Sequence, residues 1–550
     1  MILERILRFI LRIFAGMLAL VSFALFAFGL FVTISFRQFE ENDYPDMIRV
    51  NPILMLVLFL VAAVLIMKLV SIMRGGWKVP VIAATIASLV ISAFFIVVVR
   101  GLPTCDAKLL DDIVRDFYRG SYGALKQGGY LSTYPFQLSW CFIVDIAAYV
   151  AGFGNYIPYW IANALSIVIC ALALCGIADE FFENDKKRTF SVRGCAVLVA
   201  LCLWLFTYST YIYNDIVSLA PLFAGLYMTV AFLKRRNPAA GLPGVVLLGV
   251  SWWIKSNGLI ALIAAFICIA GCIFADSRPH KRKKMKKYMI RVMAAVGALI
   301  LIVAVPLCLR IVTYSHYERL SKLNIPAGTP AMAYIAMGLT ESDGKCGWYN
   351  GDNVRYYQDN GDNASLASAA AMPVIAEKMK LYTSDARFFV SFFGRKFLSQ
   401  WADPTRGALR EQELTARHRN RIETLKGLDF MNPFADFWVF GGGFGFLSWE
   451  MRVWQLLLYF FAGIGFAAAA LGRIRVNSGW GLIIIFITGG MLFHEIWEAS
   501  GRYTLRYVLA EIPVAAAGIS VIANKLDALR EPMERRRLRR YRDRRMGKLK

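Results

Sequence analysis

Histidine is scarce in this 550-residue sequence, and the common nucleotide-binding motifs are missing. The ten cysteines and the four histidines do not show the spacing of metal ligands. No G-x-x-x-x-G-K-[ST] or strand-linked G-x-G-x-x-G sequence occurs, and the glycine run Gly441–Gly445 is not followed by Lys-Ser/Thr. No repeat relates the two halves of the chain, which argues against the inverted-repeat transporter folds. The sequence therefore contains no motif that indicates a metal centre or a nucleotide-binding domain.

Apolar residues are abundant instead, at 58% of the chain with a mean hydropathy of +0.51. Stretches of about 17–25 apolar residues, long enough to cross the hydrocarbon core as a helix, recur along most of the chain. We therefore predict an all-α polytopic membrane protein with about twelve transmembrane helices. The predicted spans are residues 8–36, 51–73, 78–100, 157–179, 190–211, 214–234, 241–256, 258–276, 289–313, 451–472, 479–496 and 503–523.

The net formal charge of +24 is concentrated in short basic clusters. These clusters are Arg74–Lys78, Asp185–Arg188, Lys234–Arg236, His280–Lys287, Arg473–Arg475 and the tail 524–550. With the twelve spans, every cluster falls on the same side as the N-terminus, which predicts a multi-pass cell-membrane protein with both termini in the cytoplasm. The tail can also contact anionic membrane lipids. Orientation explains the charge without a nucleic-acid partner.

This topology leaves two long segments outside the membrane, residues 101–156 and 314–450, which we call the first and second large regions. The remaining parts are three transmembrane helices in 1–100, the central helices in 157–313, the C-terminal helices in 451–523 and the basic tail 524–550. Because the cytoplasmic connections are short, we expect the protein to act on the outer face.

One apolar stretch, Leu138–Phe153, is left out of the predicted spans. Counting it would move the basic cluster Asp185–Arg188 to the outside. It is also short, begins after the breaker Y-P-F-Q and contains Asp145. We predict that it lies in the outer interface or re-enters the membrane, and an ordinary span is the alternative.

The first large region begins with an amphipathic pattern. Apolar side chains in residues 109–118 recur on one helical face, and Asp111, Asp112 and Asp116 fall on the opposite face. The pattern predicts a helix on the outer leaflet whose charges are solvated. Asp106 precedes this helix and lies close to the membrane exit.

Lys255, in S-W-W-I-K-S-N-G, falls at the break between two spans on the outer side. Ionisable residues at that depth are costly unless they are paired or hydrated. A snorkelling lysine is one interpretation. The other is a cation for a lipid phosphate, supported by Ser256, Asn257 and the following helix N-terminus.

Two further polar sites lie at the outer ends of predicted helices. Asp215 begins a descending helix, where a role as N-cap would explain it. Glu495, Glu498 and Arg502 converge at the outer end of the last helical pair, and Glu498 and Arg502 have the i,i+4 spacing of an ion pair.

Aromatic residues are frequent in the second large region, including Trp348, Tyr349, Tyr356, Tyr357 and Trp401. Sugar-binding surfaces often stack such rings on pyranose faces, but a folded extracellular cap would contain them as well.

Three cysteines, Cys105, Cys141 and Cys346, are predicted to face the outside. Their odd number excludes complete pairing. Free thiols or one disulfide, such as Cys105–Cys346, are both compatible with the sequence.

An outward acidic residue before Y-P-F-Q, an Asp in N-D-I, an I-K-S-N after two further spans and a late E-x-x-x-R-Y occur in this order. The arrangement resembles the GT-C superfamily of polyprenyl-phosphate-dependent glycosyltransferases. Tyr130–Asn163 is similar to a segment of the bacterial branch that includes protein mannosyltransferases and the aminoarabinose transferase of lipid A. The second large region, with A-M-G-L-T, G-W-Y-N and K-F-L-S-Q-W-A-D-P-T, looks like an uncharacterised group of such proteins in Gram-positive bacteria.

The resemblance covers most of the chain and implies a GT-C-like bundle that transfers a sugar from a polyprenyl-phosphate donor. The acceptor would be an envelope glycan, lipid or protein. Asp106 would be the catalytic carboxylate, with Asp111 or Asp112 as alternatives because Ala107 and Lys108 replace an acidic signature after Asp106. The implied substrate-binding residues are Arg100, Tyr134, Asp215, Lys255, Asn257, Glu498, Arg502 and Tyr503.

Within that set, Lys255, Arg502 and Arg100 would meet the lipid phosphate, and Asp215 would hold the donor or, as in some relatives, a divalent metal ion. Direct attack on the donor would invert the anomeric centre. A transporter or flippase of lipid-linked sugars is the main alternative, and a related polymerase or ligase is a third.

Overall fold

The structure is a computed structural model that describes residues 2–36, 45–73, 76–275, 282–417 and 423–547. The N-terminal part comprises α1 (Ile2–Phe31), β1 (Val32–Phe36), β2 (Pro45–Arg49), α2 (Pro52–Ile72) and α3 (Lys78–Val99). The first large region holds α4 (Cys105–Tyr118), η1 (Gly123–Leu125), α5 (Tyr130–Thr133), η2 (Pro135–Gln137) and α6 (Leu138–Ala151). The central elements are α7 (Ile157–Glu180), α8 (Asp185–Ala200), α9 (Leu203–Thr207), η3 (Tyr208–Thr210), α10 (Asn214–Val217), α11 (Leu219–Arg235), α12 (Pro238–Ile254), η4 (Ser256–Gly258), α13 (Leu259–Ala275) and α14 (Arg282–Ser321).

The second large region holds α15 (Ala331–Gly338), β3 (Glu341–Ser342), β4 (Lys345–Cys346), α16 (Asp352–Gln358), α17 (Ala364–Ser384), α18 (Ala386–Trp401), α19 (Ala408–Ala416), η6 (Glu423–Met431), α20 (Asn432–Ala435) and η7 (Asp436–Phe440). The chain closes with α21 (Gly442–Ala470), α22 (Ser478–Ile496) and α23 (Gly501–Gly547). The two short antiparallel sheets, β1–β2 and β3–β4, are minor additions to a helical protein.

The all-α polytopic fold is confirmed. Ten helices in the described residues are long and apolar enough to cross a membrane, or up to twelve spans if two bent helix pairs each count as one. Ten of the predicted spans coincide with these ten helices. The span predicted at 190–211 is one of the bent pairs, because α8 and Leu203–Thr210 meet at an angle of 50°. The span predicted at 241–256 is α12, which is shorter, at 17 residues.

Several predicted boundaries are wrong. The first span was expected to continue to residue 36, but α1 ends at Phe31 and Val32–Phe36 pairs with Pro45–Arg49. The sequence V-T-I-S-F contains three β-branched residues, which favour a strand where a partner is available. At the other end of the chain, α23 continues beyond residue 523 through most of the basic tail to Gly547.

Asp106 does not precede the first amphipathic helix, as expected, but lies in its first turn. Helix α4 begins at Cys105, after the extended residue Thr104. The apolar periodicity starts only at Leu109, because the first turn is mostly polar and exposed. A carboxylate in this turn interacts favourably with the helix dipole.

Helix α6, in the stretch Leu138–Phe153, is too short to cross a membrane alone, with 14 residues. The preceding segment Gly123–Thr133 meets Pro135–Ala151 at 103°, so the two do not form a straight span. Its position in the outer interface stays a prediction.

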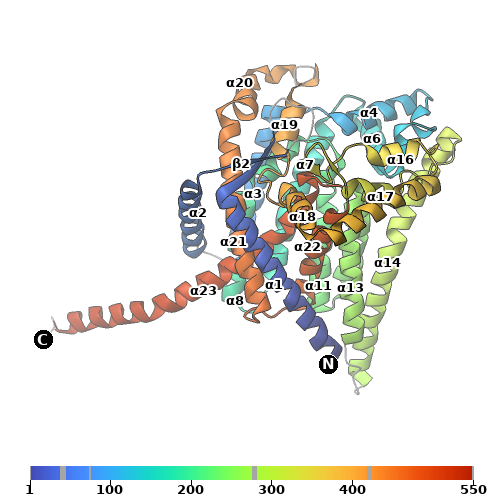
Figure 1. The fold of residues 1–550 in the computed structure, drawn as a ribbon. Coiled ribbons are helices and arrows are strands. Elements are labelled where there is room, and N and C mark those ends of the chain that lie inside the picture. Colours follow the sequence, from blue (N-terminus) through green and yellow to red (C-terminus); the bar gives the residue numbers. More distant parts are fainter. Residues whose placement is uncertain (1, 37–44, 74–75, 276–281, 418–422, 548–550) are drawn as a thin grey trace.

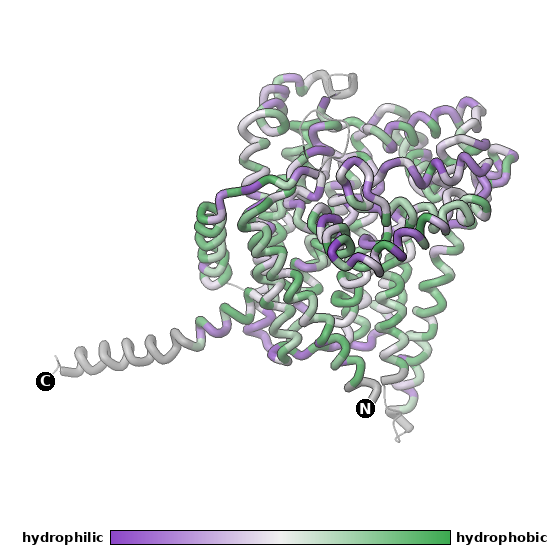
Figure 2. Tube along the Cα trace, viewed as in Figure 1, coloured by the Kyte–Doolittle hydropathy of each residue, from purple (hydrophilic) through white to green (hydrophobic). Residues whose placement is uncertain are grey.

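The bundle is arranged around α23. In the most apolar part of α23, 89% of the residues are buried, against 28% in α2, α3 and α14. Helices α2 and α14 lie at the periphery of the bundle (Figure 1). Helices α21 and α23 approach closely where Gly465 faces the Val514 backbone and Gly518 faces the Phe461 backbone, so that a side chain at either glycine would collide. Both large regions lie at the end of the bundle opposite the N-terminus (Figure 1). Between the two ends of the bundle, the residues of the helices are predominantly hydrophobic (Figure 2).

Candidate functional site

A cavity of about 1020 Å³ opens at the end of the bundle that carries the two large regions. Its walls come from α4, α5, η2, α10, the turn from α12 to η4, α14, α15, α16, α19 and the turn between α22 and α23. Some of these elements are more than 390 residues apart in sequence, since the lining runs from Cys105 to Tyr503. The cavity is therefore a product of the tertiary fold.

Asp215, at the base of this cavity, is fully buried and surrounded by cations. Its carboxylate oxygens lie 3.1 Å from Lys255 Nζ, 3.8 Å from Arg502 Nε and 3.7 Å from Arg506 Nη2. Three positive side chains thus share one carboxylate, which leaves an excess of positive charge. We call Asp215, Lys255, Arg502 and Arg506 the cationic floor.

Lys255 reaches the cavity from the break between α12 and η4. Its backbone is extended there, and Gly258 packs so tightly on Trp252 that a side chain at Gly258 would collide with the Trp252 backbone. The Lys255 ammonium donates to Asn214 Oδ1 at 3.0 Å and lies 4.9 Å from the centre of the Tyr213 ring. A lysine held by one amide, one carboxylate and an aromatic face is positioned for an anion in the cavity.

Arg502, from the first turn of α23, links the cationic floor to the second large region. Its guanidinium pairs with Glu411 Oε1 at 3.1 Å and donates to the Tyr211 hydroxyl. Arg410 and Glu411 of α19 both line the cavity. Sequence reasoning missed them, because every residue of α19 is buried although the helix carries three charged residues, and a charged helix is normally expected to face water.

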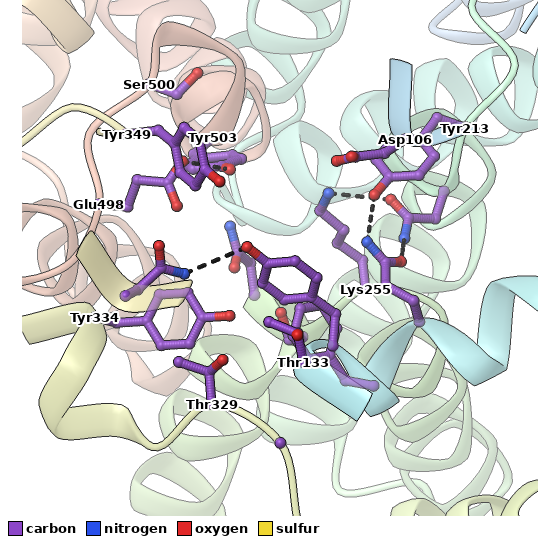
Figure 3. A pocket seen from close by; sticks show the side chains of 18 of the residues that line it. Asp106, Thr133, Tyr213, Lys255, Thr329, Tyr334, Tyr349, Glu498, Ser500 and Tyr503 are labelled. Carbon is purple, nitrogen blue, oxygen red and sulfur yellow. Dashed lines mark hydrogen bonds between the residues drawn. The ribbon is translucent and has the colours of Figure 1, made fainter. Parts of the chain in front are cut away.

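Asp106 is exposed and lines the cavity beside Cys105. The pKa of the Cys105 thiol is raised, first by burial and then by the carboxylates of Glu411 and Asp106. The carboxylates of Glu411 and Asp106, which come from distant parts of the chain, therefore both lie near Cys105 on one side of the cavity. In Figure 3, Asp106 and Lys255 lie on the right of the cavity, close to Tyr213.

The opposite side of the cavity is aromatic. Tyr334 stacks on Trp497 with ring centres 4.9 Å apart, and Tyr503 donates to Glu498 Oε1 at 3.0 Å. Tyr334, Tyr349 and Glu498 lie across the cavity from Lys255 (Figure 3). Burial raises the pKa of Tyr334 and of Tyr349, so both phenols stay neutral and available as hydrogen-bond donors.

Most of the site residues suggested by the sequence come together here. Seven line the cavity: Asp106, Tyr134, Lys255, Asn257, Glu498, Arg502 and Tyr503. Asp215 lies directly behind the lining and contacts Lys255. Glu498 and Arg502, which have the spacing of an ion pair, both line the cavity, and the Tyr503 hydroxyl donates to Glu498 Oε1 at 3.0 Å.

Arg100 is not part of this cavity, contrary to expectation. It ends α3 in a left-handed backbone conformation, is 3% exposed, and contacts Asp429 at 3.7 Å and Asn432. Its side chain therefore holds α3 against the second large region.

The two alternative carboxylates also lie elsewhere. Asp111 was predicted to be solvated, but it is 8% exposed and accepts hydrogen bonds from Arg115 and Tyr156. Tyr156, just before α7, covers the polar face of α4 at this point. Asp112 stays at the surface in an ion pair with Lys108 at 2.6 Å.

A divalent metal ion has no suitable set of ligands in the described residues, since no group of three or more His, Cys, Asp or Glu side chains could hold one. The carboxylate of Asp215 is already occupied by Lys255 and two arginines. All ten cysteines, including Cys105 and Cys346, are free thiols.

No protein-family model matches this chain, and no curated protein is significantly similar to it.

Proposed function

We propose that this protein is an integral membrane glycosyltransferase that transfers a sugar from a polyprenyl-phosphate donor to a cell-envelope acceptor. One observation carries the proposal: an exposed carboxylate, Asp106, and a surplus of buried cations around Lys255 border the same cavity. Transfer from a lipid phosphate requires both groups, a base for the acceptor and positive charge for the leaving group.

The phosphate of the donor binds at the cationic floor in this proposal. Lys255 and Arg502 line the cavity, and Asp215 neutralises only part of their charge and that of Arg506. A lipid phosphate would supply the missing negative charge. Asn257 adds an amide beside Lys255.

Asp106 acts as general base. The oxygen of an acceptor hydroxyl attacks the anomeric carbon, and the proton of that hydroxyl passes to the Asp106 carboxylate. The bond from the anomeric carbon to the phosphate oxygen breaks at the same time. The leaving polyprenyl phosphate gains negative charge, which Lys255 and Arg502 stabilise. Attack opposite to the leaving group inverts the anomeric centre.

The donor's hydrocarbon chain reaches the cavity between α12 and α14. The lining on that side includes Trp252, Trp253, Pro306 and Tyr314, all on helices that carry apolar spans or flank them. The acceptor binds on the aromatic side, where Tyr334, Tyr349 and Trp497 offer flat faces and neutral hydroxyls. The proposal requires that an acceptor hydroxyl bound there reaches the Asp106 carboxylate, with the anomeric carbon between that hydroxyl and the phosphate held by Lys255 and Arg502.

We place this cavity on the outer face of the cell membrane, with both termini in the cytoplasm. The basic clusters that predicted this orientation, such as those at Lys187, Lys234 and Arg473, border a second cavity at the opposite end. This separation of basic end and proposed catalytic end is consistent with the positive-inside rule.

The test is a reconstitution in proteoliposomes with radiolabelled polyprenyl-phosphate sugars and a membrane extract as acceptor source. The proposal expects label in a new covalent product without any ion gradient. Movement of intact labelled donor across the bilayer without a new bond would overturn it and support a flippase.

A further inference from the structure

A second cavity of about 470 Å³ lies at the opposite end of the bundle, where the N-terminus and the start of α8 are found (Figure 1). Its lining is strongly basic. It contains six cationic side chains and a single acidic one, Glu183. The cationic residues are Arg8, Lys187, Lys234, Arg236, Arg473 and Arg475.

One of the six cations has a buried carboxylate as its partner. Lys234 lies 3.3 Å from the carboxylate of Glu180, which is itself buried and also paired with Arg235. Lys234 is therefore already compensated. Lys187, Arg473 and Arg475 also line the cavity, where Glu183 is the one carboxylate among the lining residues, and like charges around one space favour an anion there.

Two helix N-termini add to the positive potential. Asn184 caps α8 and Asn477 caps α22, with side-chain oxygens 3.1 Å from the Lys187 amide nitrogen and 3.0 Å from the Trp480 amide nitrogen. Both caps line the cavity. Helices α8 and α22 have 16 and 19 residues, so each directs the positive end of a substantial dipole toward this space.

The segment before α22 presents two guanidinium groups together. Ile474 and Val476 are each 3% exposed and anchor the segment in the core, whereas Arg473 and Arg475 alternate with them and are exposed. Both arginines border the cavity. Guanidinium groups bind phosphate oxygens in a bidentate manner, which a lysine does not.

The remaining wall is apolar and continues onto a surface of the bundle suited to lipid. Leu7, Leu11 and Phe182 line the cavity, and α1 exposes Phe9 and Ile13 immediately beside it. A soluble anion would gain nothing from this wall. The acyl chains of a membrane lipid could lie along α1 while its phosphate enters the basic cavity.

We infer that this cavity binds the phosphate headgroup of an anionic membrane lipid. The lipid joins α1, α8, α11 and the segment before α22, because each of them contributes a basic side chain to the cavity lining. Binding therefore stabilises the bundle, independently of whether the protein transfers a sugar.

The test uses the purified full-length protein in neutral detergent, with phosphatidylglycerol as probe and phosphatidylcholine as the comparison. Thermal unfolding and native mass spectrometry report stabilisation and bound lipid. Phosphatidylglycerol should raise the unfolding temperature and remain bound, and phosphatidylcholine should do neither. Inorganic phosphate at millimolar concentration should give little shift, and an equal shift would overturn the lipid assignment in favour of a soluble anion.

The variant Arg473→Gln/Arg475→Gln should bind phosphatidylglycerol about tenfold more weakly or worse, because it loses charge-assisted hydrogen bonds to the phosphate. Lys286→Gln/Lys287→Gln is the matched control: it removes the same charge from exposed positions at the same end, outside the cavity. Equal loss in both variants would overturn the site and indicate attraction by overall charge. Lys187→Gln, on a different helix, gives an independent second variant with the same expected direction.

Discussion

The ammonium of Lys255 lies 3.1 Å from a carboxylate oxygen of Asp215, and that carboxylate is fully buried. The pair joins α10 to the break after α12, and Arg502 and Arg506 bring α23 to the same carboxylate. One carboxylate therefore contacts three cations, of which one lies at the break after α12 and two lie on α23. This arrangement stabilises the cavity, and even with Glu411 paired to Arg502 it leaves the three cations one negative charge short.

Asp215→Asn should destabilise the protein more than Lys255→Gln. Removing the shared carboxylate leaves three cations buried together, which costs about 3–5 kcal/mol. Lys255→Gln leaves Asp215 with two arginines and costs less, about 1–3 kcal/mol. Thermal unfolding of both variants in detergent measures the difference. Equal shifts would mean that the two arginines do not share the carboxylate with Lys255.

Asp106→Asn should lower sugar transfer by about 10²–10⁴-fold, the usual contribution of a general base. The protein should still fold, because Asp106 is exposed and lies at the cavity surface in the first turn of α4. Asp112→Asn is the matched control on the same helix, since Asp112 pairs with Lys108 at the surface and does not line the cavity. Full turnover by Asp106→Asn in proteoliposomes would remove Asp106 from the mechanism.

The fold was largely predictable because a transmembrane helix is a local property of about 20 apolar residues. The failures have tertiary causes. The strand Val32–Phe36 needs a partner that arrives only at Pro45–Arg49, and the break at Leu201-Cys202 occurs inside a continuous apolar run. Hydropathy contains no information about either.

The site was predictable where a polar residue interrupts an apolar run, as at Lys255 and Arg502. It was not predictable where the second large region supplies the residue. Glu411 lies in a helix without an amphipathic signal, about 90 residues before its partner Arg502. Asp111 shows the opposite error, because this charge on the polar face of α4 is covered by Tyr156, which lies just before α7.

Lys396→Met should destabilise the second large region. The ammonium of Lys396 is buried and donates to the carbonyl oxygens of Gly338, Glu495 and Trp497 at 2.6, 2.9 and 2.7 Å, so it connects α15, α18 and the end of α22. Its loss leaves three carbonyl groups without their donor, at a cost on the order of 3 kcal/mol. Limited proteolysis and thermal unfolding measure this effect. The matched control is Lys380→Met, because Lys380 is exposed on α17.

Cys105 offers a test of both the cavity and its orientation in the membrane. Cys105 lies in the cavity lining and stays partly accessible, and its partial burial together with the carboxylates of Glu411 and Asp106 raises the pKa of its thiol above the usual range. The reactive species is the thiolate. Labelling by a membrane-impermeant maleimide should therefore be slow at pH 7 and rise about tenfold per pH unit toward pH 9, since the thiolate fraction increases until the raised pKa is reached.

The same reagent should label intact cells if the cavity faces the outside, and a bound polyprenyl-phosphate sugar should slow the reaction by covering Cys105. Cys308, the other exposed cysteine among the described residues, lies within an apolar span of α14, where an aqueous reagent does not reach it. Cys105→Ser should consequently abolish the labelling. Labelling that requires permeabilised cells would reverse the orientation, and labelling that the donor does not slow would place the lipid-linked sugar away from Cys105 and Asp106.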